Sequence, residues 1–171
     1  MPNVLFFSLA GFAILILILV ILDRIYKKML IHVDGVDAGT NDFHTKMEPV
    51  KSSISPFESF YNNGKRVNPK DYIVRVVNGN CMIPKGIYSG DLLFIDKFNG
   101  NVNSLSEGDI LFIKYEKDGH SGYKIREYKG REKDGKLHTI YYEDDKPKNS
   151  SILHDIKNVE GKIKMKFAGL G

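Results

Sequence analysis

One uncharged apolar run constrains the fold of this chain more than any other feature. Val4–Leu22 holds 19 consecutive residues without a charged side chain, mostly Leu, Ile, Phe and Val. A helix of that length, at about 1.5 Å per residue, matches the hydrocarbon core of a bilayer. A secretory signal peptide would need a basic start, a shorter apolar core and a small-residue cleavage site. Residues 1–3 carry no charged side chain and no Ala-x-Ala step follows Leu22. We therefore expect a membrane anchor over residues 1–28, with a transmembrane helix at about 4–22.

The charges beside this run predict its orientation. Arg24, Lys27 and Lys28 follow the run, whereas only the α-amino group precedes it. Cytoplasmic flanks of membrane helices carry the excess of Lys and Arg. We expect a single-pass membrane protein with the lipid bilayer as partner of the N-terminal helix and the remaining chain in the cytoplasm.

The rest of the chain divides into a linker and a β-domain. Residues 29–70 are rich in Gly, Asp, Asn, Ser and Pro and show no sustained periodicity, which is typical of a linker. Residues 71–171 alternate short β-branched and aromatic runs with Gly-Asp and Lys-Asp-Gly turns. This pattern predicts an all-β domain of barrel or sandwich type. The expected strands are 72–77, 92–96, 110–115, 123–128, 137–142 and 159–167.

Composition narrows the functional classes. The net charge is +4, and 25 basic residues are dispersed among 21 acidic ones, so no nucleic-acid partner is expected. The single cysteine cannot form an internal disulfide. His32 and His44 lie near several aspartates, but their spacing matches no calcium or zinc template. We expect no cofactor and no metal.

The chain's one cysteine lies in a distinctive segment. Gly79-Asn80-Cys81-Met82-Ile83-Pro84 is followed by Gly90-Asp91 and an apolar run. This order resembles the nucleophile segment of the LexA-like and signal-peptidase-like serine–lysine peptidases, which reads Gly-x-Ser-Met-x-Pro…Gly-Asp. Cys81 stands in the serine position.

Three further motifs follow in the order of that superfamily. They are a second Gly-Asp turn at 108–111, the strand Tyr123-Lys124-Ile125-Arg126, and the Gly-containing segment 159–163. The resemblance covers about residues 72–167. It implies a LexA/signal-peptidase-like β-domain over residues 71–171.

The resemblance also implies a catalytic pair, with Cys81 as nucleophile and Lys124 as base. Such a base must be desolvated, and Met82 with Leu92 or Phe94 would supply an apolar wall. A thiol ionises near pH 8.5, so a thiolate–ammonium pair is chemically workable.

Backbone N–H groups are expected to stabilise the tetrahedral oxyanion in such a site. The N–H of Cys81 and one from the preceding turn are the natural donors. This assigns the oxyanion and turn residues to Gly79, Asn80 and Met82.

The chain departs from the superfamily pattern in two ways. Cysteine replaces serine, and Ile125 separates Lys124 from Arg126 where the superfamily has Lys and Arg side by side. If Arg126 keeps the superfamily register, Ile125 takes the base position and Lys124 faces the other side of the sheet. If Lys124 keeps its place, Arg126 lies two residues further on the same face. The sequence leaves both registers open.

LexA-like proteins cut themselves at a bond between a small residue and Gly in an upstream segment, and Ala38-Gly39 offers such a bond. Chance occurrence in a Gly-rich linker is the alternative. Three functions remain: a membrane-anchored peptidase that cleaves itself or a protein partner; an inactive relative that binds a peptide or protein at the membrane as a sensor or assembly module; and a signal peptidase. The charge asymmetry and the missing serine oppose the last.

Overall fold

The computed structural model describes residues 3–37, 51–55, 58–117, 120–149 and 154–168. The chain divides into two compact units. One contains Met1–His32 with Ser53–Glu58, and the other contains Val33–Ser52 with Ser59–Gly171.

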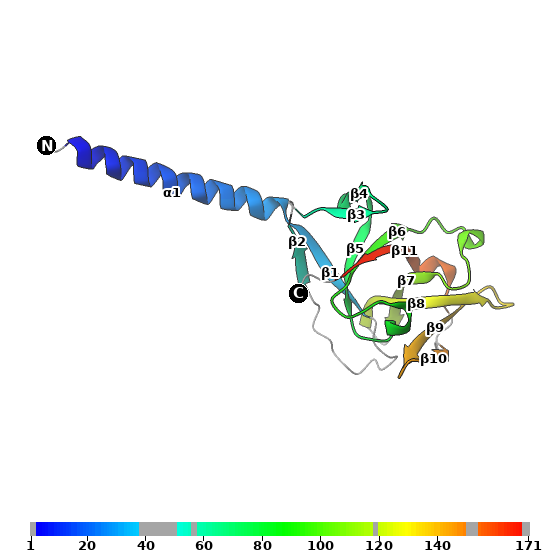
Figure 1. Ribbon diagram of the computed structural model, residues 1–171. Helices are drawn as coiled ribbons and strands as arrows, with labels where there is room; N and C mark the ends of the chain where they lie inside the picture. Colours follow the sequence, from blue (N-terminus) through cyan, green and yellow to red (C-terminus); the bar gives the residue numbers. More distant parts are fainter. Residues whose placement is uncertain (1–2, 38–50, 56–57, 118–119, 150–153, 169–171) are drawn as a thin grey trace. The chain divides into compact units, whose positions relative to one another are not determined.

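The first unit is dominated by helix α1, Asn3–Met29 (Figure 1). The helix expected over 4–22 is confirmed, and it continues through the charged flank. Lys27 and Lys28 occupy its last turn, where cations interact favourably with the helix dipole. Lys27 also pairs with Asp23 one turn earlier, at 2.8 Å.

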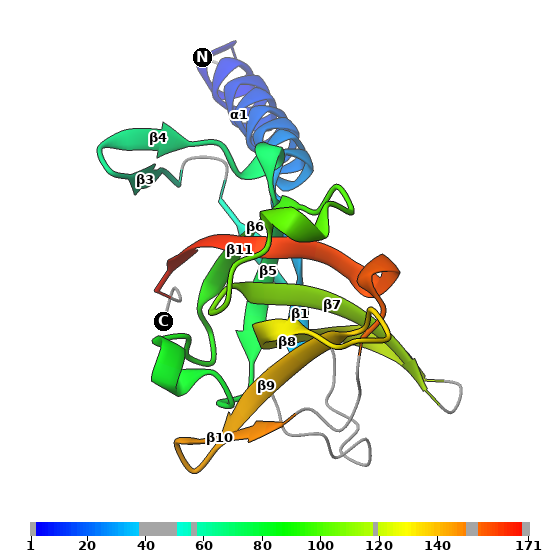
Figure 2. The same ribbon diagram turned by 90° about the vertical axis from the view of Figure 1, so that its right-hand side faces the viewer.

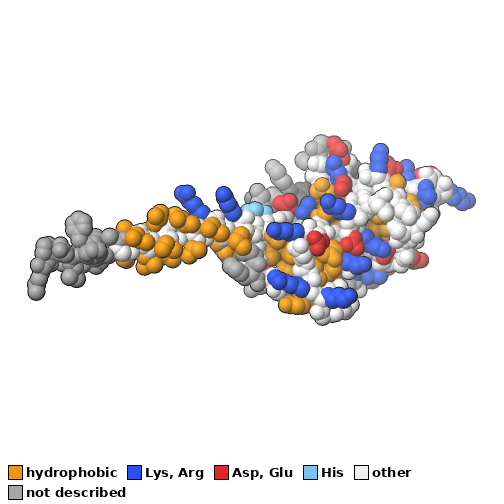
Figure 3. All heavy atoms as spheres, turned by 90° about the horizontal axis from the view of Figure 1, so that it is seen from above, with side chains coloured by type: hydrophobic (Ala, Val, Ile, Leu, Met, Phe, Trp, Pro, Cys, Tyr) orange, Lys and Arg blue, Asp and Glu red, His pale blue; other side chains and the backbone are white. Residues whose placement is uncertain are grey.

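The described side chains of α1 run from Gly11 to Met29 and all are exposed. Hydrophobic side chains cover this part of the helix (Figure 3). Within the described residues, no helix has an apolar stretch of the length needed to cross a membrane.

Strands make up most of the second unit. The six expected strands are confirmed as β5, β6, β7, β8, β9 and β11. Their bounds are Ile73–Asn78 (β5), Leu92–Lys97 (β6), Ile110–Lys117 (β7), His120–Arg131 (β8), Leu137–Glu143 (β9) and Val159–Phe167 (β11). A further strand, β10, spans Lys146–Asn149. Short 3₁₀ helices occur at Pro69–Asp71 (η1), Ile83–Lys85 (η2), Val102–Ser104 (η3) and Ile156–Asn158 (η4).

The segment expected to be a linker contains four strands. These are β1 (Ile31–Asp37), β2 (Lys51–Ile54), β3 (Phe60–Asn62) and β4 (Lys65–Val67). β3 and β4 form a separate antiparallel hairpin. β1 escaped prediction because its polar residues and Gly35 mask a strand in which only Val33 and Val36 are fully buried.

The sheet closes on itself. Its strand order is β10-β9-β8-β7-β11-β6-β5-β1-β2, and β8 also pairs with β1 (Figure 2). The closing pair places Asp37 opposite Lys124. Six strands, β8-β7-β11-β6-β5-β1, therefore form a ring, in agreement with the expected barrel-like class. β1 runs parallel to both β5 and β8, whereas the other ring pairs are antiparallel.

Two apolar clusters lie on opposite faces of β7 and β8. The ring cluster draws residues from five ring strands and from the loop after β5. The second cluster holds Leu111 and Ile113 of β7, which alternate with Phe112 of the ring cluster. The ring cluster consists of Val36, Val77, Cys81, Met82, Ile87, Leu93, Ile95, Phe112 and Ile125.

Gly161 lies where β11 closely approaches β6. A Cβ atom at this position would lie 2.3 Å from Cγ2 of Ile95 and 2.6 Å from the carbonyl oxygen of Asp96. The register of β11 against β7 also shifts between Val159 and Gly161. The glycine thus permits β11 to lie against β6.

Replacing Gly161 with alanine is expected to lower the free energy of unfolding by about 1–3 kcal/mol, because the backbone oxygen of Asp96 cannot move aside cheaply. Chemical denaturation followed by circular dichroism would measure the change. Lys164→Ala, at an exposed position of the same strand, is the control and should change stability by less than about 0.5 kcal/mol. Equal stabilities for the two variants would contradict the packing described for Gly161.

Candidate functional site

Cys81 lies in a tight loop at the end of β5. Gly79 has a φ of 102° and Gly86 a φ of 69°, both in the left-handed region that favours glycine. Between them Met82 caps helix η2, and the N–H of Ile87 donates to the carbonyl oxygen of Met82 at 3.2 Å. The two glycines let the chain reverse direction within a few residues and hold Cys81 against the ring.

The surroundings of Cys81 are apolar. Its side chain is only 5% exposed and belongs to the ring cluster with Met82, as the predicted apolar wall requires. From β6, however, Leu93 and Ile95 join this cluster. The expectation that Leu92 or Phe94 would line the site is wrong by one residue.

Phe94 instead packs in an aromatic group with Phe60 and Phe167, with ring centroids 5.0 Å away in each case. Four consecutive apolar residues, Leu92–Ile95, hide which face of the strand points toward Cys81.

Arg126 contributes a cation that contacts the Cys81 sulfur. Its Nη1 atom donates to Sγ of Cys81 at 3.8 Å and to the carbonyl oxygen of Ile125 at 2.8 Å. The guanidinium is fully buried and lies 5.2 Å from the ring centroid of Tyr141. Arginine keeps its charge in proteins, and a cation beside a thiol favours the thiolate.

The register of β8 separates the three residues that the sequence left ambiguous. Ile125 pairs with Phe112 and belongs to the ring cluster together with Cys81. Lys124 pairs with Ile113 and Arg126 with Leu111, so both cations start from the opposite strand face.

Lys124 is 4% exposed, and its ammonium lies 4.9 Å from the ring centroid of Tyr115. The role of Lys124 as base remains a prediction.

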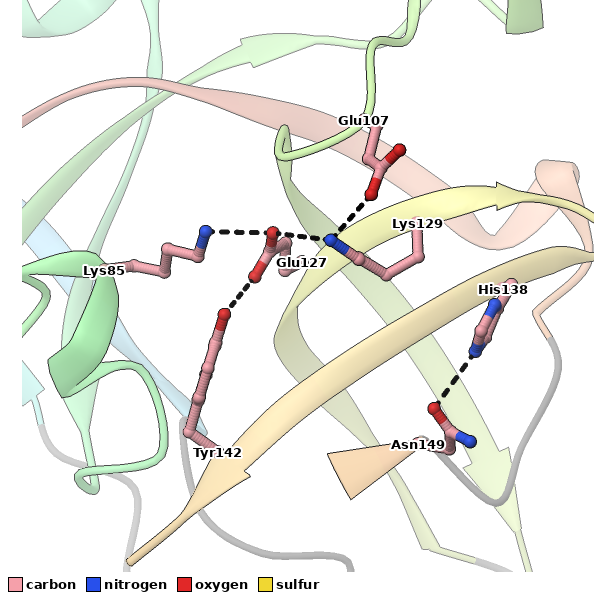
Figure 4. Close-up of polar contacts among 7 residues, drawn as sticks. All are labelled: Lys85, Glu107, Glu127, Lys129, His138, Tyr142 and Asn149. Atoms are coloured by element: carbon pink, nitrogen blue, oxygen red, sulfur yellow. Dashed lines mark hydrogen bonds and ion pairs between the residues drawn. The ribbon is translucent and has the colours of Figure 1, made fainter. Parts of the chain in front are cut away.

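Glu127 is a buried carboxylate that the sequence prediction missed (Figure 4). It accepts hydrogen bonds from the Tyr142 hydroxyl at 2.5 Å and from the Lys85 ammonium at 2.9 Å. Lys129 approaches it at 3.5 Å and pairs with Glu107 at 2.7 Å. The sequence does indicate this burial, because Glu127 follows Tyr123 and Ile125 at alternate positions and so shares their face of the strand.

Opposing effects set the charge of this group. Burial disfavours the carboxylate, but the hydrogen bonds from Tyr142 and Lys85 outweigh it and hold the pKa of Glu127 below its usual value. The hydrogen bond with Glu127 raises the pKa of Lys85. Burial, together with the hydrogen bond to Glu127, raises the pKa of Tyr142. Glu127 is therefore ionised at neutral pH.

The two Gly-Asp turns use their aspartates as structural acceptors, as expected for turn residues. Asp91 accepts from the N–H of Tyr88 at 2.9 Å, and Asp109 accepts from the N–H of Ser106 at 2.8 Å. Lysines of β11 contact both carboxylates: Lys166 lies 3.5 Å from Asp91, and Lys162 lies 3.1 Å from Asp109.

β1 brings the upstream segment to this site. Its last residue, Asp37, pairs with Asn78 of β5 and with Lys124 of β8. Val36, one residue earlier, shares the ring cluster with Cys81.

The predicted site also includes the cleavage-site residues and the oxyanion residues. Ala38 and Gly39 lie outside the described residues. Gly79 is half-buried and Asn80 is exposed, and the oxyanion roles of Gly79, Asn80 and Met82 stay predictions. No group of three or more His, Cys, Asp or Glu side chains in the described part of the chain could hold a metal ion.

Comparison with protein-family models, curated protein sequences and solved structures finds no match to this chain.

His154 is a second group that the sequence did not reveal. It is buried, and its backbone pairs with that of Leu137. Its Nε2 atom has no hydrogen-bond partner among the described residues. Burial lowers the pKa of His154 to about 4, and the charges of Arg126 and Lys124 add to this effect while Asp155 opposes it. The imidazole is therefore neutral at physiological pH.

This burial predicts a pH-dependent stability. The unfolded chain protonates His154 near pH 6.5 and the folded chain near pH 4, so the unfolded state binds more protons in between. The contribution is complete above pH 6.5 and is lost as pH falls to about 4, a change on the order of 3 kcal/mol.

His154→Leu should flatten the pH dependence of the free energy of unfolding between pH 6.5 and pH 4, as measured by urea denaturation at several pH values. His138→Asn is the matched control, because His138 is only half-buried and lies 3.3 Å from Asn149. Identical slopes in the wild type and His154→Leu would exclude a buried neutral imidazole.

Proposed function

We propose that this chain is a membrane-anchored peptidase of LexA/signal-peptidase-like type that cleaves itself with Cys81 as nucleophile. The placement of β1 carries the proposal. This strand ends opposite Lys124 and contributes Val36 to the cluster around Cys81. The bond between Ala38 and Gly39 follows directly in the sequence. An extended segment held by strand pairing is a common form of peptide recognition.

The proposed cleavage proceeds through a thioester on Cys81. Lys124 takes the proton of the Cys81 thiol, and the thiolate, favoured by Arg126, attacks the carbonyl carbon of Ala38. This attack forms a tetrahedral oxyanion that backbone N–H groups stabilise. The carbon–nitrogen bond breaks, and the amine of Gly39 leaves with a proton delivered by Lys124. Water then hydrolyses the thioester, regenerates the thiol and leaves a carboxylate on Ala38.

Self-cleavage is expected to convert the intact chain into a fragment that begins at Gly39. Mass spectrometry and N-terminal sequencing of the purified chain would detect it, and Cys81→Ala should abolish it. Lys97→Ala, at an exposed position of β6, is the control and should leave cleavage unchanged. A fragment beginning elsewhere, or cleavage that persists in Cys81→Ala, would refute this mechanism.

We further propose that α1 inserts in a bilayer. The support is the apolar run of 19 uncharged residues at 4–22 and the exposure of the large hydrophobic side chains from Phe12 onward. So much exposed apolar surface calls for an apolar environment. The basic flank at Arg24, Lys27 and Lys28 favours a cytoplasmic β-domain.

Attachment can be measured by flotation of the full chain with phospholipid vesicles. Leu15→Arg with Leu19→Arg should abolish flotation, because each charge in the apolar core costs about 2.5–3.5 kcal/mol. Lys65→Ala with Arg66→Ala, exposed in β4, should float like the wild type. Flotation that survives the arginine substitutions would argue against insertion.

A second candidate function is a non-catalytic module that binds a peptide or protein. The observation that favours it is Ile125, an apolar side chain in the cluster around Cys81 where the superfamily register would place the base. An intact chain that never self-cleaves but binds an extended peptide in competition with β1 would support this candidate.

A further inference from the structure

A single buried carboxylate connects the elements that surround Cys81. Glu127 lies on β8, next in sequence to Arg126, and its side chain is 2% exposed. Its two closest partners come from elsewhere: Lys85 from η2, directly after the Cys81 loop, and Tyr142 from β9. Figure 4 shows both side chains converging on the carboxylate.

Tyr142 holds the loop from one side. Its hydroxyl donates to Glu127, and its backbone N–H donates to the carbonyl oxygen of Cys81 at 2.9 Å. The same residue therefore binds the carboxylate with its side chain and Cys81 with its backbone.

Lys85 holds the loop from the other side. Its ammonium lies 2.9 Å from Glu127, and its backbone N–H donates to the carbonyl oxygen of Met82 at 2.9 Å. Met82 is fully buried and adjoins Cys81. The turn that follows the cysteine is thus anchored to β8, the strand that carries Arg126.

The buried charge of Glu127 makes the position of the loop depend on the partners of this carboxylate. A buried charge is tolerated only when hydrogen bonds and opposite charges compensate its desolvation. Lys129 is a more distant cation at 3.5 Å, and Glu107 also binds it. Removing one close partner leaves Glu127 undercompensated, so the loop and β9 must rearrange.

We propose that Glu127 is the positioning residue that holds the Cys81 thiol against Arg126 and so sets the ionisation and reactivity of that thiol. The use of the thiol as a nucleophile rests on the proposed peptidase function. The contacts of Glu127 with the loop do not depend on that function, and they can be tested on the thiol itself.

Alkylation by iodoacetamide provides the readout, because Cys81 is the only cysteine in the chain. The rate is measured against pH on the full-length protein, and the midpoint of the profile gives the apparent pKa of the thiol. Tyr142→Phe, which changes no charge, should shift the midpoint upward by about 0.5–1 unit, because the thiolate loses its fixed cation. Tyr142→Phe removes only the hydroxyl and leaves the Lys85 pair in place.

Three further substitutions separate positioning from general destabilisation. Lys85→Met should shift the midpoint upward as Tyr142→Phe does, whereas Lys85→Arg keeps the cation and should retain the wild-type profile. Glu107→Gln removes only the outer partner of Lys129 and should leave the midpoint unchanged.

Superimposable profiles for the wild type, Tyr142→Phe and Lys85→Met would overturn the proposal, provided that their circular dichroism spectra agree. Shifted midpoints in a chain that never cleaves itself would sustain the positioning role and reject the peptidase function alone.

Discussion

The parallel pairing of β1 with β5 and β8 is the interaction on which the β-domain depends. Without it the sheet would be open, and the ring cluster would lose Val36 and its cover between β5 and β8. The strand pairing is shortest at this closure, because Asp37–Lys124 is the one residue pair that joins β1 to β8 among the described residues. Cys81 lies beside this closure, since it shares the ring cluster with Val36 of β1.

Charged groups that proteins seldom bury lie on β8 next to this closure. Lys124, Arg126 and Glu127 follow one another closely on β8 and are almost completely inaccessible. Such groups specify one geometry rather than add much stability, because their desolvation offsets most of the attraction. A neutral His154 nearby avoids a third positive charge in the same interior.

The sequence predicted those parts of the fold that local chemistry determines. β-branched runs and Gly-Asp turns located six strands. β1 was missed because its two buried valines are separated by Asp34 and Gly35 and do not follow the alternation of a strand. The lining residues of β6 were placed out of phase because an unbroken apolar run carries no alternation.

The site was harder to predict than the strands because its contacts join distant segments. Cys81 could be singled out by its motif, but no local pattern indicates that Arg126, 45 positions later, reaches its sulfur. The network of Glu127 likewise joins β8, η2 and β9, and only the folded ring brings these together.

The path of β1 has a consequence for any break in the backbone beyond Asp37. The helix and this strand are covalently continuous, and the strand would remain hydrogen-bonded to β5 after the bond was cut. Separation would then require Val33 and Val36 to leave the interior, at about 1.5–3 kcal/mol for each side chain. The time for which the helix stays attached would be set by the dissociation rate of β1. Cleavage of the bond and release of the fragment would then proceed at independent rates.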